Sequence, residues 1–270
     1  MFTCIEILPE SRQFFVRLRE KIRPPEPVKE YIQVRGGTPF LKLKLKENAV
    51  DWRKISGCLS GDERKILFSS QVKIPDNIGI SFCIPEALGL NMMMNAFLNI
   101  AEKADNPRGI SVSVYDRYGS ATHRISELVP FVRNISVYTE KIREYFYLSS
   151  RIIKESGMSI KINEYSSHAF PEKIIVADRY SKDMKNADLI FLADSSVISY
   201  NTVTGEGILL EEELKSLKND DTDDMIFASA LYEYNKARFL GGREFIHLYL
   251  AGREIDGESI LRRLVKTGNT

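Results

Sequence analysis

The sequence predicts an α/β protein built on a mainly parallel sheet, and two observations lead to this fold class. The first is a pattern repeated between residues 108 and 196, a short apolar run that closes on a polar residue and is followed by a polar or helical segment. The runs are rich in Ile and Val and have the length of strands rather than helices. They are Ile110–Asp116, Ile135–Thr139, Met158–Asn163, Lys173–Asp178 and Asp188–Asp194.

The second observation is a helical segment between the second and third runs. Residues 140–155 place Ile142, Phe146 and Ile152 on one side of a helix, and Gly157 follows where a helix cap favours a residue tolerant of positive φ. Strands that alternate with helices indicate a parallel sheet with helices on both faces.

A smaller lobe of mixed strands and helices is predicted for residues 1–106. Residues 38–46 alternate Phe or Leu with Lys, which is the period of a strand with one face toward water, and a lysine face also suits an exposed edge strand. Turn residues at 105–109 mark the boundary to the second lobe, residues 107–270. The other predicted elements of the first lobe are strands at 2–8, 65–69 and 80–84 and helices at 51–59 and 86–103.

Beyond Asp194 the pattern loosens. Residues 197–207 are rich in Ser, Thr, Asn and Gly and predict no regular element, and residues 219–224 form an acidic loop. The elements predicted after them are helices at 209–217, 225–240 and from 258, and a closing strand at 245–250.

The composition limits the classes of partner. Lys and Arg number 38 against 37 Asp and Glu, so the chain has no overall field of the kind that draws nucleic acid or an acidic membrane. The basic cluster at 17–23 is interrupted by Glu20 and is interpreted as a solvated helix face. Cys4, Cys58 and Cys83 form no Cys-x-x-Cys pair, which favours a reducing compartment. We therefore expect a cytoplasmic protein with no nucleic-acid or membrane partner.

The candidate ligand site lies where parallel sheets bind ligands, at the carboxyl ends of the strands. The first run leads into the loop 116–124, whose small residues let backbone amides approach an anion, and the short helix that follows adds partial positive charge. We expect Arg117 and Arg124 to hold the anion and Glu140 to contact a sugar hydroxyl. The predicted ligand-binding residues are Asp116, Arg117, Gly119, Ser120, Thr122, Arg124 and Glu140.

This layout resembles the NAD(P)-binding Rossmann-like superfamily over about residues 108–200. Glu140 stands about 20 residues after the loop, where a dinucleotide site has an acid for the ribose hydroxyls. The resemblance implies a Rossmann-like, mainly parallel sheet with helices on both faces, and it makes NAD(P) the cofactor to consider. The Gly-x-Gly-x-x-Gly fingerprint is absent, because the loop has only Gly119, and Asp116 would repel a pyrophosphate.

The candidates for catalysis are two histidines and one carboxylate. His123 and His168 lie in loops that would face the same cleft and do acid/base work. Asp178 follows a predicted strand and completes the set. His247, by contrast, sits in an apolar run and is predicted to pack in the core.

Three aspartates, Asp116, Asp178 and Asp194, come directly after apolar runs. Converging carboxylates bind Mg²⁺ or share a proton, whereas an Asp after a strand commonly caps the next turn. The turn-capping interpretation is the favoured one, and no metal site is predicted.

Three functions stay open. The leading one is the binding of a small anionic or nucleotide-like ligand at the carboxyl edge of the sheet. The second is a non-catalytic scaffold, a homodimer formed through aromatic residues with Tyr138, Tyr145 and Tyr147 as the first surface candidates. The third is an NAD(P)-dependent oxidoreductase-like enzyme. No Walker loop, Gly-x-Ser-x-Gly elbow or His-Glu-x-x-His motif occurs, so whether the chain is an enzyme is left undecided.

Overall fold

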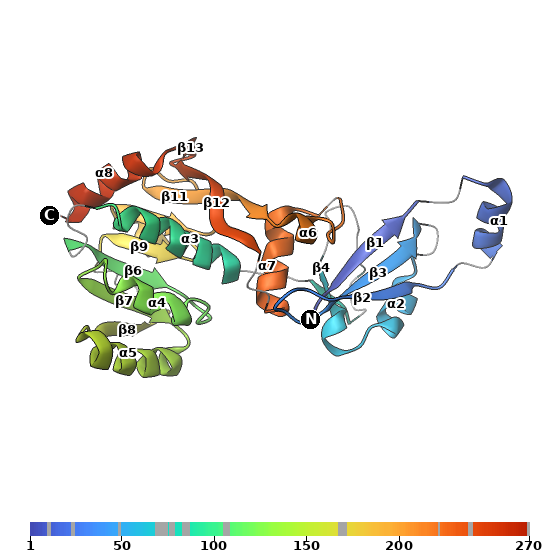
Figure 1. Ribbon diagram of the computed structural model, residues 1–270, viewed down its shortest axis with the longest axis horizontal. Helices are drawn as coiled ribbons and strands as arrows, with labels where there is room; N and C mark the ends of the chain where they lie inside the picture. The colour runs from blue at the N-terminus through green and yellow to red at the C-terminus, as the bar shows by residue number, and fades with distance from the viewer. Residues whose placement is uncertain are drawn as a thin grey trace. The chain divides into compact units, whose positions relative to one another are not determined.

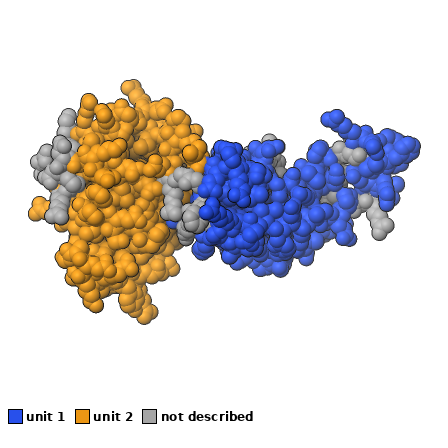
Figure 2. All heavy atoms as spheres, viewed as in Figure 1, with its two compact units in different colours: residues 1–85, 210–241 blue, residues 86–209, 242–270 orange. Residues whose placement is uncertain are grey.

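The computed structural model divides into two compact units, drawn in different colours in Figure 2. Unit 1 comprises Met1–Pro85 and Leu210–Gly241, and unit 2 comprises Glu86–Leu209 and Gly242–Thr270. The structure describes residues 1–9, 12–22, 25–47, 50–67, 75, 79–82, 87–104, 109–166, 172–220, 222–236 and 240–268.

Unit 2 is built on an eight-stranded sheet in the order β13-β12-β11-β10-β9-β6-β7-β8 (Figure 1). All neighbours from β8 to β11 pair in parallel, and β13 pairs antiparallel with β12 at the edge. Counted from β6, the parallel strands stand in the order 3-2-1-4-5-6, which is the order of a doubly wound Rossmann-like sheet. The strands are β6 (Ser111–Tyr115), β7 (Asn134–Thr139), β8 (Ile160–Glu164), β9 (Ile174–Ala177), β10 (Leu189–Leu192), β11 (Thr202–Leu210), β12 (Gly241–Leu250) and β13 (Arg253–Glu254).

Both faces of this sheet are covered. Alternate strand residues such as Val112 and Val137 share one apolar core with side chains from α3, α4, α5 and α8. On the opposite face, Met184 of the short 3₁₀ helix η5 packs with Tyr115 and Tyr138. The bounds are α3 (Ala87–Ala101), α4 (Ile125–Leu128), α5 (Ile142–Ser156), α8 (Gly257–Gly268), η4 (Thr122–Arg124) and η5 (Lys182–Asn186). The predicted fold class is confirmed.

Unit 1 has a five-stranded sheet in the order β2-β3-β1-β4-β5. β1 pairs in parallel with β3 and β4, and β2 pairs antiparallel with β3. Phe2 stacks on Phe40, and Phe227 meets both rings edge-on. The elements are β1 (Thr3–Leu8), α1 (Phe14–Ile22), β2 (Val28–Ile32), β3 (Phe40–Lys46), α2 (Trp52–Cys58), η2 (Gly61–Arg64), β4 (Lys65–Leu67), β5 (Ser81–Phe82), α6 (Glu212–Lys215) and α7 (Asp224–Tyr234).

The lysine-rich strand is confirmed, but its place in the sheet is not. β3 lies between β2 and β1 rather than at an edge. Its lysines pair with acids of the neighbouring strands, Lys42 with Glu6 and Lys44 with Glu30. The alternation therefore reflects cross-strand charge pairing, which a single sequence does not separate from edge protection.

The compact units divide the chain differently from the predicted boundary at residue 106. Helix α3 comes before that boundary, yet Leu90, Met93 and Phe97 belong to the core of unit 2. Residues 210–241 come after it and belong to unit 1. The chain thus runs from unit 1 into unit 2, returns to unit 1, and ends in unit 2.

The segment 197–207, predicted to be irregular, contains most of strand β11. Helix α7 ends at Tyr234, short of the predicted residue 240, and strand β12 begins at Gly241. Among the residues described, no helix has both the length and the apolar character that crossing a bilayer requires.

Candidate functional site at the carboxyl edge of the unit 2 sheet

The candidate site lies where the strand order of the sheet reverses. β6 and β9 are neighbours, with Tyr115 opposite Ala177; β7 and β8 follow on one side and β10 and β11 on the other. Asp116 and Asp178 are the next residues after these two strands. Both therefore stand at the switch point, where doubly wound sheets bind ligands.

The carboxylate of Asp116 is fully buried and accepts four hydrogen bonds. Oδ1 accepts from the amide and the hydroxyl of Ser120, at 2.9 and 3.0 Å. Oδ2 accepts from the amide of Ala121 at 2.7 Å and from the hydroxyl of Tyr145 at 2.6 Å. Two of these donors are the backbone amides of the loop, the groups that an anionic ligand would use.

The backbone amides of the loop after β6 thus bind a carboxylate of the protein itself, that of Asp116. Gly119 has a φ of +75°, and a Cβ there would lie 3.1 Å from atoms of Lys141 and Glu144. The hydroxyl of Thr122 donates to the Gly119 carbonyl at 2.7 Å. Gly119, Ser120 and Thr122 therefore serve the internal structure of the loop. The loop does not fit a dinucleotide pyrophosphate, because Asp116 already fills the position of the anion.

Arg124 does not face a ligand. The residue is 5% exposed, and its Nη1 donates to the carbonyl of Asn91 at 2.6 Å. Its Nη2 and Nε donate to Glu127, the shorter bond being 2.6 Å. The guanidinium of Arg124 thus has its hydrogen-bond partners inside unit 2, at Asn91 and Glu127.

Arg117 and Glu140 come together, as expected for residues at the ends of β6 and β7, but they pair with each other. Nε of Arg117 donates to Glu140 at 2.9 Å, and both side chains are partly exposed. The guanidinium also lies over the rings of Tyr118 and Tyr165, 5.2 and 5.4 Å from their centroids. This edge therefore presents a cation between two aromatic rings, next to an exposed carboxylate.

Asp178 is the most perturbed carboxylate of the site. Burial and the neighbouring Asp116 raise its pKa to about 6, although the amide of Arg179 donates to it at 2.8 Å. Burial and the negative charge of Asp178 also raise the pKa of the Tyr165 phenol. A carboxyl group that titrates near neutral pH, at a switch point, is suited to bind a hydrogen-bond donor or to exchange a proton.

Polar residues on the strands under this edge were missed in the sequence. The hydroxyl of Tyr115 donates to the Tyr165 carbonyl at 2.8 Å. The hydroxyls of Ser113 and Ser136, both buried, donate to the two carboxylate oxygens of Glu172, at 2.6 and 2.5 Å. The signal was the alternation of Ser and Tyr with Val along β6 and β7, which indicates one polar and one apolar face.

The remaining chemical candidates lie only partly within the described residues. His123 is exposed, and His168 lies outside the described residues. The prediction that His247 packs in the core is wrong. Its side chain is exposed on β12 and pairs with Glu254 at 2.7 Å, because this strand lies toward the edge of the sheet. Asp194 accepts bonds from the amide and hydroxyl of Ser196, so it caps a turn. Among the described residues no group of acids, histidines or cysteines has the arrangement of a metal site.

Two of the three expected surface tyrosines are buried. Tyr138 is 1% and Tyr145 0% exposed, whereas Tyr147 is 68% exposed. The inward face of α5 carries Tyr145, Leu148 and Ile152, and Phe146, predicted to face inward, is 62% exposed. The prediction was right for Ile152 and wrong at the first turns of the helix, where Tyr145 rather than Phe146 is buried and its hydroxyl donates to Asp116.

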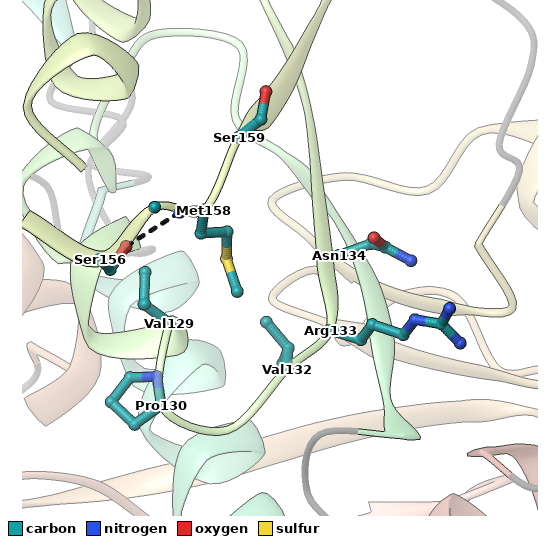
Figure 3. A pocket seen from close by; sticks show the side chains of 9 residues that line it. Val129, Pro130, Val132, Arg133, Asn134, Ser156, Met158 and Ser159 are labelled. Carbon is teal, nitrogen blue, oxygen red and sulfur yellow. Dashed lines mark hydrogen bonds between the residues drawn. The ribbon is translucent and has the colours of Figure 1, made fainter. Parts of the chain in front are cut away.

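A hollow of about 700 Å³ lies at the opposite, amino-terminal edge of the sheet (Figure 3). It is lined by residues of the two segments that lead into β7 and β8, namely 129, 130, 132–134 and 156–159. Figure 3 shows Met158 and Val132 directed into it and the guanidinium of Arg133 directed away. None of the predicted site residues lines this hollow, so it is separate from the switch point.

The strand order and parallel register define a Rossmann-like α/β protein. No protein-family model matches the sequence, and neither does any curated protein. Among solved structures, the crystal structure of L-tryptophan dehydrogenase from Nostoc punctiforme is similar at 11% sequence identity, with a TM-score of 0.30, over 99% of this chain and 79% of that chain. The fold assignment rests on the topology of unit 2 itself.

Proposed function

We propose that this protein binds a small nucleoside-like ligand, a flat ring that carries hydroxyl groups, at the carboxyl edge of the unit 2 sheet. The single observation that carries the proposal is the environment of Asp178, a nearly buried carboxyl group at the switch point with a pKa raised to about 6. A carboxylate that is costly to ionise gains most from a ligand that donates hydrogen bonds to it.

The other groups at the edge suit the rest of such a ligand. Tyr118 is 50% exposed and stacks with Arg117, so a flat ring can extend the stack. Glu140 stands at the end of β7, where an acid binds ribose hydroxyls in this fold. The loop amides already bind the carboxylate of Asp116, which argues against a phosphate as the recognised group. Of the small anionic or nucleotide-like ligands expected from the sequence, a nucleoside without its phosphate therefore fits best.

A thermal-shift and calorimetric comparison tests this proposal. Adenosine, guanosine, cytidine and uridine are compared with their 5′-phosphates, with NAD and NADP, and with sugar phosphates. We expect a nucleoside to raise the melting temperature and its phosphate to add nothing. The Asp178→Asn variant should lose this shift, and Asp188→Asn, at an exposed acid of the same unit, should keep it. No shift with any nucleoside, or an unchanged shift in Asp178→Asn, would overturn the proposal.

A scaffold function is the second candidate, and adjacent exposed aromatics on α5 favour it. Phe146 and Tyr147 are 62% and 68% exposed and are neighbours on α5, and contiguous exposed apolar side chains are one mark of an interaction surface. Light scattering of the wild type and of a Phe146→Arg, Tyr147→Arg variant tests for a homodimer through this helix. A dimer that becomes a monomer in the variant supports it, and a wild-type monomer at tens of micromolar removes it.

A further inference from the structure

Helix α1, Phe14–Ile22, exposes large apolar side chains along most of its length. Phe14 is 70%, Phe15 83%, Leu18 48% and Ile22 78% exposed, and the rings of Phe14 and Phe15 meet edge-to-face with their centroids 5.7 Å apart. In the described part of the chain, α1 makes no extensive contact with any other helix or strand. Figure 1 shows it standing apart from the sheet of its unit.

These four side chains share one face of the helix. At 3.6 residues per turn, positions 14, 15, 18 and 22 fall within an arc of about 100°. The positions outside the arc carry Val16, one acid and three basic residues. The basic residues are Arg17, Arg19 and Lys21, and the acid is Glu20. The helix is therefore amphipathic, with Arg19 and Lys21 next to the two edges of the apolar arc, Val16 and Glu20 opposite it, and a net positive charge outside it.

We propose that α1 is a peripheral attachment site for a membrane surface that contains anionic lipids. A short helix with aromatic and aliphatic residues on one face and basic residues on the other lies in the plane of the lipid headgroups. The apolar face enters the boundary of the acyl chains, and the cations meet the lipid phosphates and carboxylates. The sequence alone suggested a solvated basic helix face. The exposed apolar face of the same helix leads us to propose a membrane surface instead.

Lipid suits this face better than a second protein does. A specific protein interface buries about 800 Å² on each partner and involves about 20 to 30 residues a side. The apolar face of α1 offers four side chains. Insertion into a bilayer needs no complementary surface, and the positive side of the helix gives the preference for anionic lipid.

Vesicle co-sedimentation of the full chain tests the proposal. Vesicles of phosphatidylcholine alone are compared with vesicles in which a quarter of the lipid is phosphatidylserine. We expect binding to the anionic vesicles that falls with added salt. Each basic residue near an anionic surface changes the partition coefficient by roughly fivefold, so Arg19→Glu should weaken binding by at least that factor. The double variant Phe14→Glu, Phe15→Glu should reduce binding to the background.

A matched pair of exposed aromatics serves as the control. The variant Phe146→Glu, Tyr147→Glu changes rings of similar exposure on α5 and should bind vesicles like the wild type. Thermal melts verify that all variants are folded, which is expected because the changed side chains are exposed. Three results would overturn the proposal: no binding to anionic vesicles, equal loss in both double variants, or a wild-type homodimer that the Phe14→Glu, Phe15→Glu variant dissociates. The last result would assign α1 to contact between copies of the chain.

Discussion

The hydroxyl of Tyr145, at the first turn of α5, donates a 2.6 Å hydrogen bond to Oδ2 of Asp116, at the end of β6. Both residues are 0% exposed, and burial, reinforced by the Asp116 charge, raises the pKa of the phenol, so the tyrosine stays a donor. The bond ties α5 to the loop that binds phosphate in related architectures. Helix and loop thus hold an internal anion where a ligand anion would sit.

Replacement of Tyr145 by Phe should destabilise the protein by about 1 to 3 kcal/mol, because a buried carboxylate loses one charge-assisted donor. Urea unfolding followed by circular dichroism measures the change. Tyr147→Phe is the matched control on the same helix, and at 68% exposure it should stay within about 0.5 kcal/mol of the wild type. Equal stabilities for the two variants would mean that the bond contributes nothing.

A comparison of two glycines with nearly equal φ separates the cost of backbone strain from the cost of crowding around an added Cβ. Gly119 and Gly157 have φ values of +75° and +74°, but a Cβ finds neighbours at 3.1 Å only at Gly119 and open space at Gly157. Gly157→Ala should cost about 1 kcal/mol for the left-handed conformation. Gly119→Ala should cost roughly 1 kcal/mol more, because Lys141 and Glu144 must move. Chemical denaturation of both variants measures the difference, and a smaller cost at Gly119 would contradict the closed loop.

Arg124 should affect stability rather than ligand affinity. Its guanidinium caps the carbonyl of Asn91 and holds Glu127, so Arg124→Ala should destabilise unit 2 by about 1 to 3 kcal/mol. Arg117→Ala breaks an exposed pair with Glu140 and should cost less than about 1 kcal/mol. The free energies of unfolding of the two variants, measured under the same conditions, test this expectation. A larger loss for Arg117→Ala than for Arg124→Ala would indicate that Arg124 is a surface residue.

The strands around the switch point were predictable because buried parallel strands are continuous apolar runs with Ile and Val. β6, β9 and β10 fall inside the predicted runs, and β7 begins one residue before its run, at Asn134. β11 was missed since its two glycines and two threonines look like a loop. Gly205 is required there, however, because a Cβ would collide with the ring of Phe245. That constraint comes from a residue 40 positions away and has no local signal.

The sequence predicted where the residues of the candidate site lie, but not which partners they contact. The rule of strand ends located Asp116, Arg117, Glu140 and Asp178 correctly at one edge. From the sequence, the loop amides were expected to be open to a ligand. In the structure, the amides of Ser120 and Ala121 donate to the carboxylate of Asp116 instead. Whether an aspartate turns inward to its own loop depends on a donor from another element, here Tyr145, which only the folded chain supplies.

Asp178 makes the stability of the protein depend on pH in an unusual direction. Its pKa is about 6 in the folded protein against about 3.9 in an unfolded chain, so the folded state holds the proton more tightly. The stability contributed by this group is therefore fully present below about pH 4 and is lost as the pH rises through about 6. The difference of about two units corresponds to roughly 2 to 3 kcal/mol.

Replacement of Asp178 by Asn removes the titrating carboxyl and should remove this loss. Relative to the wild type, the variant should gain roughly 2 kcal/mol in free energy of unfolding between pH 4.5 and pH 7.5, measured by urea denaturation at both values. Asp188→Asn, which removes an exposed partner of Lys173, should show a much smaller change between the same two values. If the difference between Asp178→Asn and the wild type is the same at both pH values, the carboxyl is not held protonated by its surroundings. Asp178 would then give no support to a donor-binding site at the switch point.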